Sequence, residues 1–305
     1  MDLTSRLWVF GRRLLGRWGT YLLRNIMAEL NFMLGNYEDP RSRPFGVSAM
    51  VCTYNEEDWV IEALLSAKDL VDEYVVVDSS TDRTPELVMR LRDDGLDIRL
   101  YRISPGDLST ARALAIRKSK YRWILHLDAD FIFYDWAPKY LRKFIEELNE
   151  RKHYLIYWPW IVLCGDLRHK CGEKAYHIEH WLFTYSNTLN YRDLMINGKP
   201  SDHLIAPLRL YKVIYINKVL GLHLGGIRKP SRLAMKYLWQ SFRDEYQREI
   251  IRGINPEEFF RRKAKEVYSI DDLEEVGKKL INEMVKSLPL YSGEYPSLLL
   301  RYLRT

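Results

Sequence analysis

The stretch Trp123-Ile124-Leu125-His126-Leu127-Asp128-Ala129-Asp130 decides the fold of this chain, because it joins a short apolar strand to two carboxylates. Four apolar residues among the first five are typical of a strand that is covered on both faces, as in a parallel sheet. Ligands of open α/β sheets bind at the carboxyl ends of the strands. Asp128 and Asp130 are therefore expected at the mouth of a site, where their mutual repulsion favours a divalent cation that carries phosphates.

Two further strands upstream end in polar residues. Residues 47–56 read Val-Ser-Ala-Met-Val-Cys-Thr-Tyr-Asn-Glu, and residues 74–78 read Tyr-Val-Val-Val-Asp. Helices are expected over residues 57–68, 84–93 and 108–118, and a third strand is expected over residues 98–103. This alternation of strands and helices predicts an α/β fold with right-handed crossovers and a mostly parallel sheet.

Three motifs in this order carry a resemblance: Cys-Thr-Tyr-Asn-Glu-Glu from Cys52, Val-Val-Val-Asp-Ser-Ser-Thr-Asp-Arg-Thr from Val75, and the stretch that ends at Asp130. Over about residues 45–135 the chain resembles the family 2 glycosyltransferases of the GT-A fold, whose Rossmann-like sheet is flanked by helices. The resemblance implies a nucleotide-sugar donor. It also implies that Asp128 lies near the ribose and the metal ion, that Asp130 is the main metal ligand, and that the donor contacts are Thr53, Tyr54, Glu56, Asp78 and Arg112.

Each of these residues also has a simpler interpretation. Asp78 could cap the following helix, since aspartate favours such positions. Arg112 could lie on a solvated helix face, and it is followed by Ala113 where family members often have Asn or Gly. Tyr54 could be a packed aromatic residue. His126 is expected to pack inside the strand region rather than to bind metal.

The second half of the chain is expected to complete the site. Strands are predicted over residues 207–212 and 219–224, a pair that resembles the distal part of some family members and makes His223 the best counterpart of their metal-binding histidine. Two carboxylates and one imidazole suit Mn²⁺ or Mg²⁺. Arg228, followed by Lys229 and Arg232, is well placed to neutralise a leaving diphosphate. For the catalytic base, Asp202 is the first choice, and Glu179 and Asp166 follow.

Charge and cysteine content limit the possible partners. The chain has 305 residues, a net charge of +6 and a pI near 9.0, which suits nucleotide phosphates or anionic lipid surfaces. No nucleic-acid-binding motif is found. Cys164 and Cys171 could form a disulfide or a zinc site, but their spacing matches no standard zinc pattern. The shortage of cysteine favours a reducing compartment, so the expected location is cytoplasmic or peripheral on the inner face of the cell membrane.

The chain is expected to divide into four parts. Residues 1–44 form a basic amphipathic segment and linker, residues 45–150 the nucleotide-sugar-binding half, residues 151–229 the acceptor-binding half, and residues 230–305 a helical region. On a helix over residues 4–34, one stripe holds four arginines and an adjoining face holds aromatic and aliphatic residues: Arg6, Arg13, Arg17 and Arg24, then Leu7, Phe10, Leu14, Trp18, Tyr21 and Leu22. Such a helix could lie on a membrane surface or pack its apolar face on the catalytic domain.

These observations predict a metal-dependent glycosyltransferase that moves a sugar from a nucleotide-sugar donor to an acceptor hydroxyl, on a lipid-linked or cell-envelope glycan. The family resemblance implies that the transfer inverts the configuration of the sugar. Two alternatives remain open. A sugar nucleotidyltransferase can share the fold but needs a glycine-rich opening loop, which residues 53–56 do not provide. A non-catalytic nucleotide-sugar-binding protein on the same scaffold would have little need of the two intact aspartates.

Overall fold

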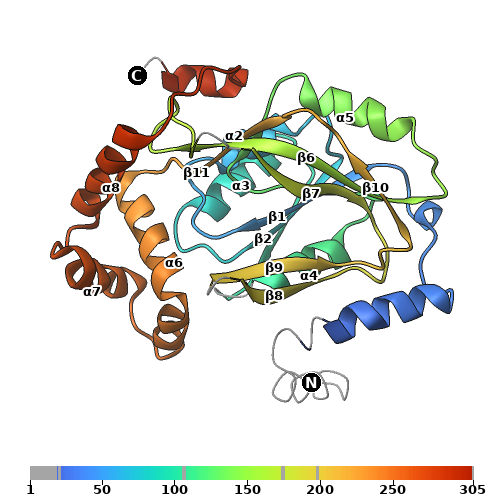
Figure 1. The fold of residues 1–305 in the computed structure, drawn as a ribbon, viewed down its shortest axis with the longest axis horizontal. Coiled ribbons are helices and arrows are strands. Elements are labelled where there is room, and N and C mark those ends of the chain that lie inside the picture. The colour runs from blue at the N-terminus through green and yellow to red at the C-terminus, as the bar shows by residue number, and fades with distance from the viewer. Residues whose placement is uncertain (1–18, 20–21, 105–107, 173–175, 197–198, 304–305) are drawn as a thin grey trace.

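The structure, a computed structural model, describes residues 19, 22–104, 108–172, 176–196 and 199–303 (Figure 1). A helix over residues 22–33 precedes the α/β part of the chain and is called the N-terminal helix below. The other helices are α2 (Val60–Ser66), α3 (Thr84–Asp93), α4 (Leu108–Lys118), α5 (Ala137–Glu146), α6 (Pro230–Ile251), α7 (Pro256–Tyr268) and α8 (Leu273–Ser287), with 3₁₀ turns η1 (Pro40–Ser42) and η2 (Ser297–Leu303).

The strands are β1 (Val47–Thr53), β2 (Glu73–Asp78), β3 (Ile98–Arg102), β4 (Trp123–His126), β5 (Phe131–Phe133), β6 (His153–Cys164), β7 (Tyr176–Thr184), β8 (Asn190–Ile196), β9 (Lys199–Ile205), β10 (Tyr211–Tyr215) and β11 (Gly221–Gly226). Within the described residues they form one large sheet in the order β3-β2-β1-β4-β7-β6-β11-β5, with β10 on β6, and a separate β8–β9 ribbon. Strands β1 to β4 are parallel to one another, whereas β7 is antiparallel to β4 and β6.

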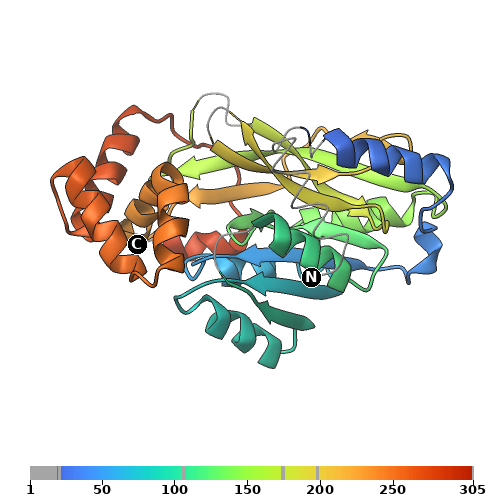
Figure 2. The same ribbon diagram turned by 90° about the horizontal axis from the view of Figure 1, so that it is seen from below.

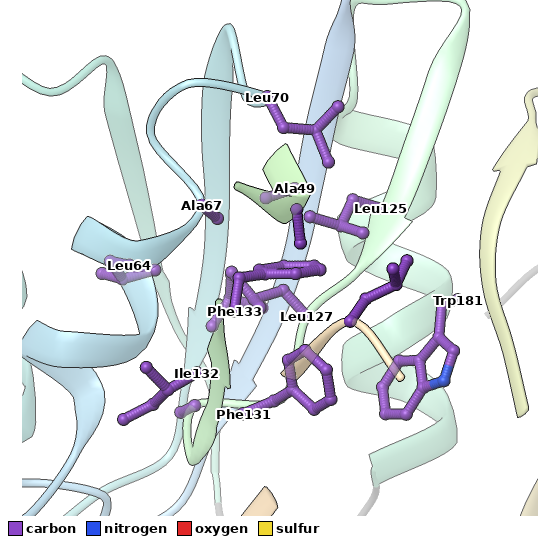
Figure 3. Close-up of a cluster of buried hydrophobic side chains, with 14 of the residues drawn as sticks. Ala49, Leu64, Ala67, Leu70, Leu125, Leu127, Phe131, Ile132, Phe133 and Trp181 are labelled. Atoms are coloured by element: carbon purple, nitrogen blue, oxygen red, sulfur yellow. The ribbon is translucent and has the colours of Figure 1, made fainter. Parts of the chain in front are cut away.

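The central parallel strands β1, β2 and β4 have mainly apolar middles because a core lies on each face of the sheet. On β1, Ala49 and Val51 belong to the core beneath α2, α3 and α5, and part of this core is seen in Figure 3. Met50 points the other way, into the core beneath α4 and the β8–β9 ribbon. Burial on both faces explains why β1 and β2 lack the polar alternation of a half-exposed strand. The expected α/β fold with a mostly parallel sheet flanked by helices is confirmed.

The three C-terminal helices form a third core of their own. Leu238 and Tyr246 of α6 pack with Phe259 and Phe260 of α7, and Val276 of α8 completes the cluster. Helix α6 is kinked at Phe242, where φ is −121° and ψ is 26°. Figures 1 and 2 show this group of helices at one end of the sheet, away from the N-terminal helix.

Several local expectations are corrected. Asp78 does not cap the following helix: α3 begins at Thr84, whose backbone N–H donates to Asp82 Oδ1 at 2.9 Å and whose hydroxyl accepts from the Glu56 N–H. The strands expected over residues 207–212 and 219–224 run instead over Tyr211–Tyr215 and Gly221–Gly226. Cys164 and Cys171 are joined in a disulfide with 5.2 Å between their Cα atoms, which removes the zinc alternative. Trp158 and Trp181 are fully buried core aromatics. The four-part division of the chain stays a prediction.

Candidate active site

The two aspartates and the distal histidine converge at the end of β4. Asp128 and Asp130 lie in the turn between β4 and β5, and the antiparallel pairing of β5 with β11 sets His223 opposite Phe131. His223 Nε2 lies 3.6 Å from Asp128 Oδ2 and 3.2 Å from Asp130 Oδ1. One ligand atom from each residue lies within 4.8 Å of the others. Because three donors point at one small volume, this group fits a divalent cation, and Mn²⁺ or Mg²⁺ suits its oxygen and nitrogen atoms.

The charge states of these three groups depend on one another. Burial disfavours the charged imidazole, but the Asp130 and Asp128 carboxylates outweigh this effect and raise the pKa of His223. Burial also opposes ionisation of Asp128, yet His126 and His223 hold the pKa of that carboxyl well below its ordinary value. Burial opposes ionisation of Asp130 as well, but His223, Lys236 and Arg228 lower the pKa of its carboxyl. Both carboxylates are therefore ionised near neutral pH. His126 packs beside Trp181 with its Nε2 3.2 Å from Asp128 Oδ1, outside the three-residue group.

Basic side chains on the loop between β11 and α6, and on α6 itself, approach the same carboxylates. Arg228 Nη2 lies 2.9 Å from Asp130 Oδ2 and 2.6 Å from Glu56 Oε2. Lys236 Nζ donates to the Gly225 carbonyl at 2.8 Å and lies 3.8 Å from Asp130 Oδ2. Burial raises the pKa of Glu56 to about 7, and burial together with Arg228 lowers the pKa of Lys236. The site thus holds cations that a phosphate group could share with Asp130.

A cavity of about 310 Å³ opens beside this charged group. The predicted donor residues Thr53, Tyr54, Glu56 and Arg112 line it, as do Asp128, Asp130, His223 and Arg228. Arg112 Nη2 lies 3.4 Å from Asp128 Oδ1. Of the predicted donor set the cavity lining therefore includes all but Asp78.

Asp78 lies behind the wall of the cavity. It is fully buried, and its carboxylate accepts from the Thr53 hydroxyl at 2.6 Å and pairs with Arg102. Its neighbours Val77 and Ser79 line the cavity. Asp78 thus supports Thr53 in this structure, while its contact with a base or ribose stays a prediction.

The turn after β1 has its conformation fixed by side chains. Asn55 adopts φ of 57°, a left-handed conformation that asparagine tolerates. Its N–H donates to Ser80 Oγ at 2.7 Å, and its side-chain oxygen accepts from Thr81 N–H at 2.8 Å. The turns after β1 and β2 are therefore joined at the edge where the cavity opens.

Apart from Arg232, which was predicted near the diphosphate, the cavity residues that helix α6 provides were not predicted from the sequence. The cavity-lining side chains of α6 are spaced three and four residues apart, on one face of the helix: Arg232, Met235, Lys236, Trp239, Arg243 and Tyr246. Phe260 of α7 lines the cavity as well. Arg232 also fixes the first turn of α6 to the nucleotide half through Glu57 at 3.1 Å, Asp58 at 3.2 Å and Asp82. The helical spacing of basic and aromatic residues was the available signal.

The predicted catalytic bases are placed only by their backbones. Asp202 lies on β9 opposite Asp193 of β8, and Glu179 lies on β7 opposite Trp158 of β6. Their side chains fall outside what the structure describes, so both stay predictions. Asp166 accepts from His169 at 2.7 Å and from the Arg168 N–H at 2.8 Å, which is a local structural role.

Comparison with known proteins identifies the family. The family model for glycosyl transferase family 2 matches residues 48–218, more than half of the chain, so the chain belongs to this family. Uncharacterized glycosyltransferases of Rickettsia bellii and Rickettsia conorii are 28% identical over 139 and 137 residues. Each match covers 44% of this chain but only 20% or 21% of the relative, so the chain spans about a fifth of their length.

One similar solved structure covers most of the chain. The crystal structure of residues 1–349 of S. aureus TarS is 14% identical in sequence to this chain, and the two superpose with a TM-score of 0.42. The match covers 79% of this chain and 71% of the TarS chain. The family predicted from the three sequence motifs is confirmed by the family match.

Proposed function

We propose that this chain transfers a sugar from a nucleotide-sugar donor to an acceptor hydroxyl with the help of Mn²⁺ or Mg²⁺. The observation that supports this most directly is the composition of the cavity wall. There the Asp128–Asp130–His223 group lies beside Arg228 and Lys236. A nucleoside diphosphate carries several negative charges, and this wall offers both a cation site and fixed cations for them.

The proposed reaction needs one proton acceptor and one stabilised leaving group. The acceptor oxygen forms a bond to the anomeric carbon while the bond from that carbon to the diphosphate oxygen breaks, and the configuration inverts. A carboxylate of the acceptor-binding half takes the hydroxyl proton; Asp202 is our first candidate and Glu179 our second. A bound cation would offset charge on the departing diphosphate, and Arg228 and Lys236 would share that task.

We assign the acceptor to the lipid-linked or cell-envelope glycans and the location to the cytoplasm or the inner face of the cell membrane. The basic amphipathic segment over residues 4–34 supports this part of the proposal. The Cys164–Cys171 disulfide is typical of oxidising compartments and points the other way. The redox state of these two thiols in cells is therefore a direct test of the location.

The proposal is tested by incubating the protein with a panel of nucleotide sugars and Mn²⁺. Release of a nucleoside diphosphate supports a transferase, whereas release of pyrophosphate from a nucleoside triphosphate and a sugar phosphate would indicate a nucleotidyltransferase. Binding of the donor without either product would leave a non-catalytic binding protein. A thermal-shift screen selects the donor first, since a bound ligand stabilises the native state.

The matched variant for this test is Asp130→Asn. It keeps the shape of the side chain but removes the charge that a metal ion needs. We expect it to lower turnover by roughly 100-fold or more while the protein stays folded. Asp93→Asn, at an exposed position of α3, is the control and should keep full activity. Unchanged activity of Asp130→Asn over a range of Mn²⁺ concentrations would refute the metal assignment.

A further inference from the structure

The N-terminal helix has its polarity reversed relative to an ordinary surface helix. Its apolar side chains point away from the protein: Leu22 is 61% exposed, and Leu23, Ile26, Met27, Leu30, Met33 and Leu34 are exposed as well. The side toward the protein holds Ala28, which is 5% exposed, and the polar residue Glu29. At 100° per residue the seven exposed apolar residues fill an arc of about 140°.

This exposure belongs to an ordered helix. The helix is closed at its C-terminal end by backbone hydrogen bonds from Leu34 to Leu30 at 2.9 Å, from Gly35 to Phe32 at 3.0 Å and from Asn36 to Asn31 at 2.8 Å. Single exposed apolar residues are normal, but a contiguous row of them marks a surface that binds another protein or a membrane. The seven residues are called the outer face below.

The outer face continues onto a neighbouring turn. The Leu208 N–H donates to the Glu29 carboxylate at 2.5 Å, which joins the helix to the turn that follows β9. Leu208 itself is 72% exposed, and the next residue, Arg209, is exposed too. Figures 1 and 2 show the helix at the outside of the molecule, remote from the C-terminal helices. Both the apolar row and a basic side chain thus lie on this side of the protein.

The positive charge of residues 1–28 indicates what kind of partner covers the outer face. Residues 1–28 contain a single acidic residue, Asp2, against five arginines: Arg6, Arg12, Arg13, Arg17 and Arg24. Two copies of the chain packed through their outer faces would bring two such basic segments together, which is electrostatically unfavourable. An anionic lipid surface accepts both the basic side chains and the apolar row.

We propose that the outer face is a docking surface for an anionic lipid bilayer, on which the protein lies peripherally. Within the described part of the chain, no helix has the length and apolar character that a membrane span requires. Apolar insertion of the outer face and attraction of the arginines act together, so the interaction is reversible and only partly dependent on salt. Docking through this face rests on the membrane location proposed above, but it does not depend on the chemistry of the cavity.

The docking surface also bears on the acceptor. Strand β9 ends immediately before the turn that holds Leu208, and its partner β8 packs on α4, the helix that carries Arg112 of the cavity wall. The β8–β9 ribbon therefore links the docking surface to the proposed donor site. A lipid-linked acceptor would be held on the same side as this ribbon.

The experiment uses the full chain and vesicles of phosphatidylcholine with or without phosphatidylglycerol. We expect the protein to sediment with the anionic vesicles at least tenfold more strongly than with the neutral ones, and more weakly at high salt. The double variant Ile26→Glu and Leu30→Glu, at the centre of the arc, should weaken vesicle binding at least tenfold. Leu290→Glu is the matched control, since Leu290 is 69% exposed but lies in the C-terminal part of the chain.

Two further measurements make each outcome decisive. Thermal shift with the donor selected above checks that the double variant folds and binds as the wild type does. Analytical ultracentrifugation without lipid checks for self-association. Vesicle binding that the double variant retains would overturn the proposal, and so would a wild-type dimer that the same two substitutions dissociate. A failure of the glycosyltransferase assay would leave the vesicle result unaffected, so the two proposals fail separately.

Discussion

Gly225 lies where a side chain would disturb the Asp128–Asp130–His223 group, the proposed metal site, without removing any of these three side chains. A Cβ atom at this position would come within 2.7 Å of His223 Cε1 and 3.2 Å of Asp130 Oδ2. The Gly225 backbone also lies against the imidazole, with its nitrogen atom 3.2 Å from His223 Nδ1. Groups that orient metal ligands typically affect metal affinity by 10- to 100-fold.

Gly225→Ala should therefore lower the affinity for Mn²⁺ by roughly tenfold. The methyl group must displace the imidazole or the Asp130 carboxylate, and overpacking of this kind costs about 1–3 kcal/mol of stability. Titration calorimetry with Mn²⁺ measures the first effect and urea unfolding the second. Wild-type Mn²⁺ affinity in a folded Gly225→Ala variant would contradict the role of His223 as a ligand.

Lys236 of α6 lies close to the proposed metal site, with its Nζ 3.8 Å from Asp130 Oδ2. Lys236→Met keeps the length of the side chain and removes the charge, so the affinity for the free nucleoside diphosphate should fall by roughly tenfold, or about 1.4 kcal/mol. Lys278→Met, an exposed position on α8 that pairs with Glu274 at 3.6 Å, is the control. Equal calorimetric affinities of the two variants for the diphosphate would remove Lys236 from the proposed donor site.

Among individual residues, those whose place in the site could be predicted from the sequence are the ones positioned by sheet topology. Asp128, Thr53 and Glu56 follow parallel strands, whose carboxyl ends meet at one edge. Lys236 and Trp239 could not be placed, because their approach to that edge depends on how α6 packs more than 100 residues further along the chain. Their shared helix face was visible, but the surface that it covers was not.

At the scale of elements, His153 connects β6 to the linker that follows the N-terminal helix. Its Nε2 lies 3.0 Å from the Glu38 carbonyl oxygen and its Nδ1 lies 3.1 Å from Thr184 Oγ1. Burial lowers the pKa of His153 below its ordinary value of 6.5. The neutral ring therefore fits the folded state, and protonation favours unfolding.

The lowered pKa of His153 determines how the folding stability depends on pH. As the pH falls below 6.5, the unfolded chain takes up a proton at His153 while the folded chain does not, so stability decreases until the depressed pKa of the folded state is passed. His153→Gln should lose stability at neutral pH and show a smaller further decrease between about pH 7.5 and 5. Urea unfolding of both proteins over this range measures the difference. Parallel pH profiles would show that His153 titrates alike in both states.

The elements themselves were predictable to different degrees. Strands β1, β2 and β4 have continuous apolar runs because they are covered on both faces, and these runs were recognised. The β8–β9 ribbon was not assigned, since it contains Asp193, Pro200 and Asp202, which are residue types that strands disfavour. Its position over α4 comes from tertiary packing, with Tyr191 fully buried there.

At the scale of the whole molecule, the C-terminal helices and the nucleotide half hold each other in place. The Tyr54 and Tyr246 hydroxyls lie 2.6 Å apart, and Arg232 pairs with three carboxylates of the nucleotide half. Helix α8 crosses the start of α6 at Gly277, where a Cβ atom would overlap the Pro230 backbone. The division between a nucleotide-binding half and a separate helical region, drawn from charge and periodicity alone, could not reveal this dependence.

The position of α6 in the cavity wall has a thermodynamic consequence. A nucleotide that contacts both the strand ends and α6 binds only those molecules in which the helix lies against the sheet. By mass action the nucleotide should then suppress local opening of α6, α7 and α8 together, because the three share one core. Amide hydrogen exchange should slow in α8, which does not line the cavity, by about tenfold at ten times the dissociation constant.

Exchange in β3, at the opposite edge of the sheet, serves as the internal reference for this measurement. Protection confined to the strand ends would mean that α6 opens independently of the nucleotide. If α8 is protected as well, the energy of nucleotide binding extends through the shared core of the three helices to one that does not line the cavity. Substitutions in their core, such as Val276→Ala, would then lower nucleotide affinity by increasing the fraction of molecules in which the cavity has lost one wall.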